Sequence, residues 1–264
     1  MEQSINSQVF LSEKIKNGRI PMARVWWMLA LRSLVSFGFL LLLALIFSVS
    51  GQPAAIQKSA AWWLWFVTGA NIASILMMWH FGKKEGVPLK DMYFASRTEW
   101  KKDLKWFLLA LAGSAVLVQY PGTFLAQLLF EDAATPNAML MQALPLLAIY
   151  PLFLLMPATQ AFAELPLYWG YASPRLKAAG MRPWTAVVIA SFLLSVQHMF
   201  FAFQPDWRYA FWLAVKFLPF AMWTGFIIEK RPSVLPYLMA THFLLDSSLP
   251  LLILMVSLGI EIGF

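Results

Sequence analysis

The sequence predicts an all-α protein, a polytopic membrane helix bundle of seven or eight transmembrane helices. Of the 264 residues, 60% are hydrophobic, against roughly 45–50% in a soluble domain. Only 12% are charged, about half the usual share, and the mean hydropathy is +0.65. A chain this poor in charge cannot cover a globule with a hydrated surface. These values therefore exclude a soluble enzyme and a disordered chain.

Charge and cysteine content narrow the class of function further. The net charge of +7 would suggest nucleic acid binding in a soluble protein, but Lys and Arg also gather on the cytoplasmic side of membrane proteins. We therefore expect a lipid bilayer, and no nucleic acid, as the partner. The absence of cysteine excludes disulfides, thiolate metal sites and a cysteine nucleophile. Residues 1–264 are expected to form a single integral membrane domain, whose oligomeric state the sequence does not indicate.

Apolar runs of about 20 residues, the length that crosses a bilayer, recur along the chain. The expected spans cover residues 26–49, 60–81, 106–130, 140–173, 183–203, 209–228 and a seventh from 233 onward. Four prolines would kink or divide the fourth span, and Pro121 could break the third. Residues 250–264 could form a short eighth span or continue the seventh.

The distribution of basic residues predicts the orientation of the bundle. Sixteen of the 20 Lys and Arg residues fall in residues 1–24 and in the second, fourth and sixth connections, so all four segments are expected in the cytoplasm. Residues 82–105 carry seven of them, interleaved with aromatic side chains. An amphipathic segment on an anionic leaflet is the expected role, and substrate binding is the alternative. Short loops favour a bacterial inner membrane.

Ionisable side chains inside apolar spans are costly, so each is a candidate for function. The candidates are Glu164 in the fourth span, His198 in the fifth, and His242 and Asp246 in the seventh. They lie ~14–20 Å from the expected cytoplasmic ends of their helices at 1.5 Å per residue. This depth places the site in the core, near the cytoplasmic side of the midplane. Because His242 and Asp246 are four residues apart, they share one helix face.

These side chains suit peptide hydrolysis. Glu164 could act as a general base on a water molecule, while the two histidines orient that water or donate to an oxyanion. Asp246 could fix the tautomer of a histidine. A zinc site is the competing interpretation, although no H-E-x-x-H helix is present. Pairing between helices without catalysis is a further alternative.

Two other basic residues fall within spans and are given no functional role. Arg32 lies near the start of the first span, so its long side chain is expected to extend to the membrane interface. Lys216 in the sixth span is expected to extend to the interface in the same way or to pair locally.

Three segments at the candidate residues resemble the motifs of the CPBP intramembrane proteases, the CAAX-prenyl endopeptidase and bacteriocin-processing group also called Abi. Residues 164–176, E-L-P-L-Y-W-G-Y-A-S-P-R-L, are similar to the first motif, E-E-x-x-x-R. Residues 194–198, L-S-V-Q-H, resemble F-x-x-x-H, and residues 242–246, H-F-L-L-D, resemble H-x-x-x-N/D. The resemblance covers about residues 140–250.

The resemblance implies an intramembrane endopeptidase whose catalytic core is residues 140–250. Glu164 would be the catalytic glutamate that activates water, His198 and His242 the motif histidines, and Asp246 the closing acidic residue. The substrate would be a membrane-associated peptide or protein, and no tightly bound metal or other cofactor would be needed. We expect the cavity that holds these residues to open to the cytoplasm.

Two positions depart from the first motif. Leu165 stands where the family has a second Glu, and Trp169 stands where it has Arg. An ion pair replaced by apolar packing costs less than a single unpaired charge, so both losses together are compatible with activity. A non-catalytic membrane scaffold or regulator is the alternative function, and a proton-coupled carrier is a third.

The charge asymmetry yields a test of topology in a background already free of cysteine. A single cysteine introduced at Lys90 should react with a membrane-impermeant thiol reagent only from the cytoplasm. A cysteine at Asp132, in a connection without Lys or Arg, should react only from outside. Labelling of position 132 from the cytoplasm alone would contradict the predicted orientation.

Overall fold

The computed structural model describes residues 7–94 and 99–261. Within these ranges all regular structure is helical, as the composition predicts. Three stretches covered by the sequence analysis lie outside the described residues: 1–6 of the N-terminal segment, 95–98 of the basic connection, and 262–264 of the C-terminal run.

The described residues contain seven helical segments that are long and apolar enough to cross a membrane, which confirms the predicted bundle. They are α2 (Met22–Val49), α4 (Trp63–Glu85), α6 (Trp100–Phe130), Leu146–Ala178, Pro183–Phe201, Trp207–Lys230 and Pro232–Ser257. The residues considered for an eighth span belong largely to α16 (Ser248–Ser257), which directly follows α15 (Leu235–Asp246). The seventh span is thus the sum of these two helices and the short turn η2 (Pro232–Val234).

The fourth span is continuous but irregular. It comprises α8 (Leu146–Ile149), α9 (Leu152–Leu165), a π-helical turn η1 (Pro166–Ala172) and α10 (Ser173–Ala178). Pro166 has no N–H to donate to the preceding turn, and the helix widens from that residue onward. Such π-helical turns often occur at functional sites. Here the widened turn follows directly after Glu164 and Leu165.

Pro121 does not break the third span, because α6 runs through it without interruption. A proline removes only one hydrogen bond from a helix, and its neighbours supply another contact. The indole N–H of Trp212 donates to the carbonyl oxygen of Gly122 at 2.9 Å, which ties α6 to α13 (Trp207–Val215).

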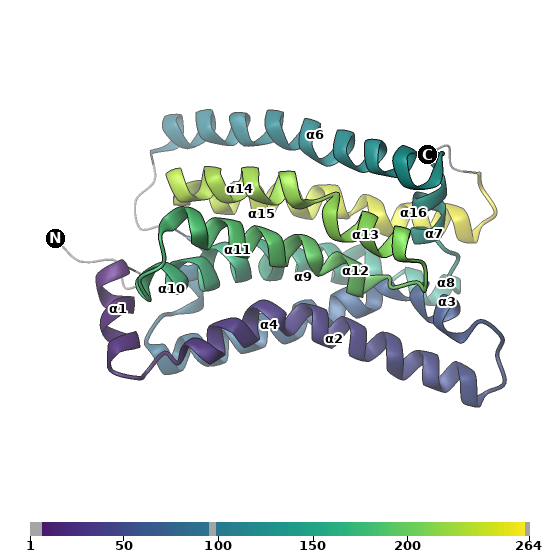
Figure 1. The fold of residues 1–264 in the computed structure, drawn as a ribbon, viewed down its shortest axis with the longest axis horizontal. Coiled ribbons are helices and arrows are strands. Elements are labelled where there is room, and N and C mark those ends of the chain that lie inside the picture. Colours follow the sequence, from purple (N-terminus) through teal and green to yellow (C-terminus); the bar gives the residue numbers. More distant parts are fainter. Residues whose placement is uncertain (1–6, 95–98, 262–264) are drawn as a thin grey trace.

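The seven spans lie side by side, with short helices at both ends (Figure 1). The N-terminal helix α1 (Gln8–Lys16) packs on α10 at one end. The helices α3 (Ala55–Ala60) and α7 (Thr135–Leu140) lie at the other end (Figure 1). Between the first two spans and the rest, α9 packs on both α4 and α15. The remaining helices are α5 (Leu89–Tyr93), α11 (Pro183–Val196), α12 (His198–Phe201) and α14 (Leu218–Lys230).

The buried core consists of two apolar clusters separated by a polar layer. Along α2, Leu31 belongs to the first cluster and Leu40 to the second, and the buried Arg32 and Ser36 lie between them. The other central helices repeat the pattern, with a buried polar residue in the interval between the clusters. These residues are Asn71 in α4, Glu164 in α9 and Gln197 after α11. The layer therefore runs across the bundle at one depth.

Candidate active site

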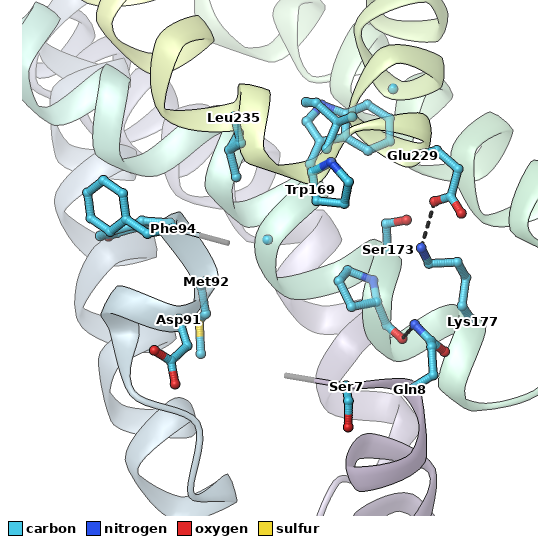
Figure 2. Close-up of a pocket in the computed structure, with 16 residues that line it drawn as sticks. Ser7, Gln8, Asp91, Met92, Phe94, Trp169, Ser173, Lys177, Glu229 and Leu235 are labelled. Atoms are coloured by element: carbon cyan, nitrogen blue, oxygen red, sulfur yellow. Dashed lines mark hydrogen bonds and ion pairs between the residues drawn. The ribbon is translucent and has the colours of Figure 1, made fainter. Parts of the chain in front are cut away.

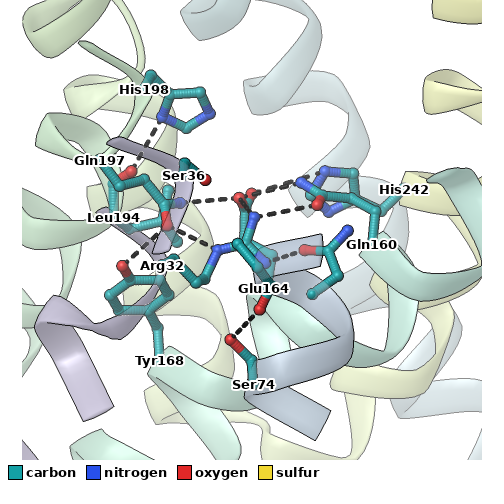
Figure 3. A network of polar contacts seen from close by, with 12 residues as sticks. Arg32, Ser36, Ser74, Gln160, Glu164, Tyr168, Leu194, Gln197, His198 and His242 are labelled. Carbon is teal, nitrogen blue, oxygen red and sulfur yellow. Dashed lines mark hydrogen bonds and ion pairs between the residues drawn. The ribbon is translucent and has the colours of Figure 1, made fainter. Parts of the chain in front are cut away.

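Arg32 is the centre of the polar layer, and the expectation that it extends to the interface is wrong. Its side chain is fully buried and donates to oxygens on three other segments of the bundle (Figure 3). Its partners are Gln197 Oε1 at 2.7 Å, Gln160 Oε1 at 3.0 Å, Glu164 Oε2 at 2.9 Å and Asn71 Oδ1. Arg32 lies ten residues after Met22, or ~15 Å along the helix, which is too deep for its head group to reach water easily.

The two carboxylate oxygens of Glu164 have different surroundings. Oε2 accepts from Arg32, from Gln160 Nε2 at 3.0 Å and from Gln197 Nε2 at 2.8 Å. Oε1 faces His242, whose Nε2 lies 3.7 Å away, too far for a direct hydrogen bond. One oxygen is therefore fixed by the protein, and the other faces the imidazole across a gap.

The π-helical turn η1 supplies a further partner to this network. Tyr168, which is fully buried, donates from its hydroxyl to Gln197 Oε1 at 3.0 Å. The amide of Gln197 thus accepts from Tyr168 and Arg32 and donates to Glu164. Since both ends of the amide are engaged, its orientation is fixed. The widened turn after Glu164 therefore helps to orient that same carboxylate.

His242 and Asp246 extend the site onto α15. The imidazole Nε2 lies 3.1 Å from Asp246 Oδ2, on one helix face, but the two atoms are not aligned as a hydrogen bond. Both residues keep 15% of their side-chain surface exposed, against 2% for Glu164. Among the described residues, the buried His242 Nδ1 has no hydrogen-bond partner. Unsatisfied buried groups of this kind are typical of positions occupied by water or substrate.

His198 lies in the same cavity but not in this chain of contacts. Its Nδ1 is 3.0 Å from the carbonyl oxygen of Leu194 and 3.2 Å from that of Ser195. Two acceptors at Nδ1 require the proton there, so in the neutral ring Nε2 is an acceptor. The ring packs on Phe217 with centroids 4.2 Å apart. Within the described parts of the chain, no hydrogen bond or ion pair joins His198 to Glu164, His242 or Asp246.

A cavity of about 230 Å³ connects the four candidate residues. Its wall includes Glu164, His198, His242 and Asp246, and it extends to Asn137, Leu140 and Met141 at the α7 end. This is the end opposite to α1 (Figure 1). The expectation of an opening at the N-terminal, predicted cytoplasmic, end is therefore wrong. Fully buried side chains, including Leu167 and Tyr168, fill the bundle on the α1 side of Glu164.

The two departures from the first motif lie away from this network. Leu165 is buried in the apolar cluster at the α1 end. Trp169 faces a separate pocket of about 370 Å³ between α5, η1 and α14 (Figure 2). There Lys177 and Glu229 form an ion pair of 2.6 Å, and burial raises the pKa of the Tyr93 hydroxyl to about 12. The guanidinium partner of Glu164 therefore comes from Arg32 on α2 and not from the motif position.

Sequence reasoning missed the polar residues that surround Glu164: Arg32, Asn71, Gln160 and Gln197. Two signals could have identified some of them. Gln160 precedes Glu164 by four residues and so shares its helix face, and the depth of Arg32 equals that estimated for the candidates. Lys216, expected to extend to the interface or pair locally, is also buried with 8% exposure and lines the cavity.

The donor set does not form a preassembled metal site. Among the described residues, no group of three His, Asp or Glu side chains has the arrangement needed to hold a metal ion. Comparison of the chain with protein-family models, with curated proteins and with solved structures finds no match. The functional argument therefore depends on the geometry of the site itself.

The Arg32–Glu164 pair can be tested by a double-mutant cycle. Arg32→Met should destabilise the protein by about 3–5 kcal/mol, because it leaves a buried carboxylate without its counter-charge. The double variant Arg32→Met/Glu164→Met should lose much less than the sum of the two single variants. Thermal unfolding in detergent measures each value, with Ser36→Ala as the control one turn away on α2. Additive losses would contradict a direct pair.

Proposed function

We propose that the protein is an intramembrane endopeptidase of the CPBP type, in which Glu164 activates a water molecule to hydrolyse a peptide bond. One observation carries this proposal: Glu164 presents Oε1 to a cavity, 3.7 Å from His242 Nε2, while Oε2 is fixed by Arg32 and two amides. A gap of this length between polar atoms is typical of a position where water intervenes. A carboxylate held in this way is oriented as a general base requires.

The proposed reaction uses these groups in sequence. Glu164 Oε1 takes a proton from the water, whose oxygen adds to the carbonyl carbon of the substrate. The tetrahedral intermediate then collapses, the C–N bond breaks, and the leaving amine takes the proton from Glu164. His242 orients the water, and Asp246, in contact with its Nε2, orients His242. His198, fixed through Nδ1, offers Nε2 as an acceptor to water or a substrate N–H.

The substrate of this reaction is a membrane-associated peptide or protein. The cavity is surrounded by spans that a lipid bilayer would cover, so a soluble protein would have poor access. The distribution of Lys and Arg supports an N-terminus in the cytoplasm, and the compact chain favours a bacterial inner membrane. In that orientation the cavity is nearer the external surface. Glu164 activates the water in this scheme without a bound metal.

A second candidate function, a non-catalytic membrane scaffold, is favoured by the completeness of the Arg32 network. Arg32 bonds to four acceptors, and each of its two glutamine partners also donates to Glu164. Closed networks of this kind can serve only to join helices within the bilayer. The two functions differ in what they require of Glu164: a proton acceptor in the enzyme, and only a hydrogen-bonding group in the scaffold.

Glu164→Gln separates the two functions. The amide keeps the size and most of the hydrogen bonds but cannot take a proton, so activity should fall by something like 10²–10⁴-fold. The assay is complementation of a deletion strain, with the level of folded protein measured in parallel. Glu131→Gln, the same change at an exposed position, is the control and should complement fully. Activity should also persist after treatment with a chelator.

The scaffold predicts the opposite result for the same variant. If Glu164→Gln is expressed at the wild-type level and restores growth completely, Glu164 is not a general base. In that case only variants that disturb folding, such as Arg32→Met, would lose function. His242→Ala tests the enzyme independently, since its loss should impair turnover while leaving Arg32 and Oε2 of Glu164 paired.

A further inference from the structure

Lys216 occupies an unusual position in the cavity wall. It lies at the junction of α13 and α14, where the helix is interrupted before Pro219. Its side chain is 8% exposed, and it is the only lysine or arginine among the described residues that line the cavity. The lysine stem also lies against Gly122 of α6, where a β-carbon would be 3.8 Å from Lys216 Cδ.

The ammonium group of Lys216 contacts aromatic rings but no carboxylate. Its Nζ lies 3.5 Å from the ring centroid of Trp212 and 4.8 Å from that of Phe217. The Trp212 indole is held in turn by its hydrogen bond to Gly122. Across the described ranges, Lys216 takes part in none of the ion pairs or side-chain hydrogen bonds. The contact with Trp212 recovers only part of what an ammonium loses on leaving water.

The other charged groups of the site do not neutralise Lys216. Glu164 is paired with Arg32 at 2.9 Å, and Asp246 is in contact with His242 at 3.1 Å. A lysine buried in this way lacks a counter-ion from the chain itself. The cavity in front of it measures about 230 Å³, many times the roughly 10–15 Å³ that one water molecule needs. It therefore has room for a small organic anion.

We infer that Lys216 is an anion-binding residue, and that the cavity accepts a carboxylate group of its ligand as the counter-ion of this lysine. The inference goes beyond the proposed hydrolysis, because it concerns what the cavity binds and not what happens to it. In a peptide the carboxylate has two sources, the free C-terminus or the side chain of Asp or Glu. Both would place a negative charge at Lys216 and the rest of the ligand toward Glu164.

Three small probes distinguish these sources in purified wild-type protein. N-acetylglycine carries a free α-carboxylate, the amide of N-acetylaspartic acid carries only a side-chain carboxylate, and N-acetylglycine amide is neutral. A ligand at about ten times its Kd should raise the melting temperature by roughly 3–5 °C for a chain of this size. We expect this shift, relative to sodium chloride at equal ionic strength, from at least one acid and not from the neutral amide. The acid that gives the larger shift identifies the source.

Variants of Lys216 complete the test. Lys216→Arg keeps the positive charge and should retain a shift with the acids, whereas Lys216→Met keeps the length of the side chain and should lose it. Lys58→Met removes an exposed lysine at the α3 end and is the control that should behave like wild type. If Lys216→Met does not fold, the comparison of acids with the neutral amide in wild-type protein still decides.

Two results would overturn the inference. Equal shifts with acids and neutral amide in wild-type protein would show that the cavity does not select a negative charge. A shift with the acids that survives in Lys216→Met would place the anion elsewhere. Since melting is measured without turnover, either result is independent of whether Glu164→Gln abolishes activity.

Discussion

A guanidinium in the middle of an apolar bundle is the constraint on which the rest of this structure depends. Arg32 has no water around it, so its hydrogen bonds must be satisfied by the protein, since an unpaired buried charge is strongly destabilising. Its acceptors come from α4, α9 and the segment after α11. This requirement fixes the relative depth of four segments and explains why a polar layer separates two apolar clusters.

The same constraint makes the two oxygens of Glu164 unequal. Because Arg32, Gln160 and Gln197 all bond to Oε2, Oε1 is left to face His242 and the cavity. The π-helical turn that begins at Pro166 adds Tyr168 to the network. A carboxylate that is anchored on one side and accessible on the other satisfies two requirements of a general base: a fixed geometry and a free acceptor.

The sequence predicts the features of this protein that depend on local pattern. Seven spans follow from apolar runs of sufficient length, and the contact of His242 with Asp246 follows from their spacing on one helix. The partners of Arg32 cannot be predicted in this way, because they depend on which helices are neighbours. Leu165 and Trp169 suggested that the guanidinium of the first motif was lost, yet a residue more than 130 positions earlier supplies it. The end of the bundle reached by the cavity is likewise a property of packing.

The most direct test of this account is an experimental structure of the wild-type protein in a lipid environment, at a resolution that shows ordered water. The account predicts a water molecule in contact with both Glu164 Oε1 and His242 Nε2, with Arg32 bonded to Oε2 alone. In the structure of Glu164→Gln, Arg32 should keep its glutamine partners. A site in which His242 bonds directly to Glu164 with no water between them, or in which Arg32 points away from Glu164, would contradict the account.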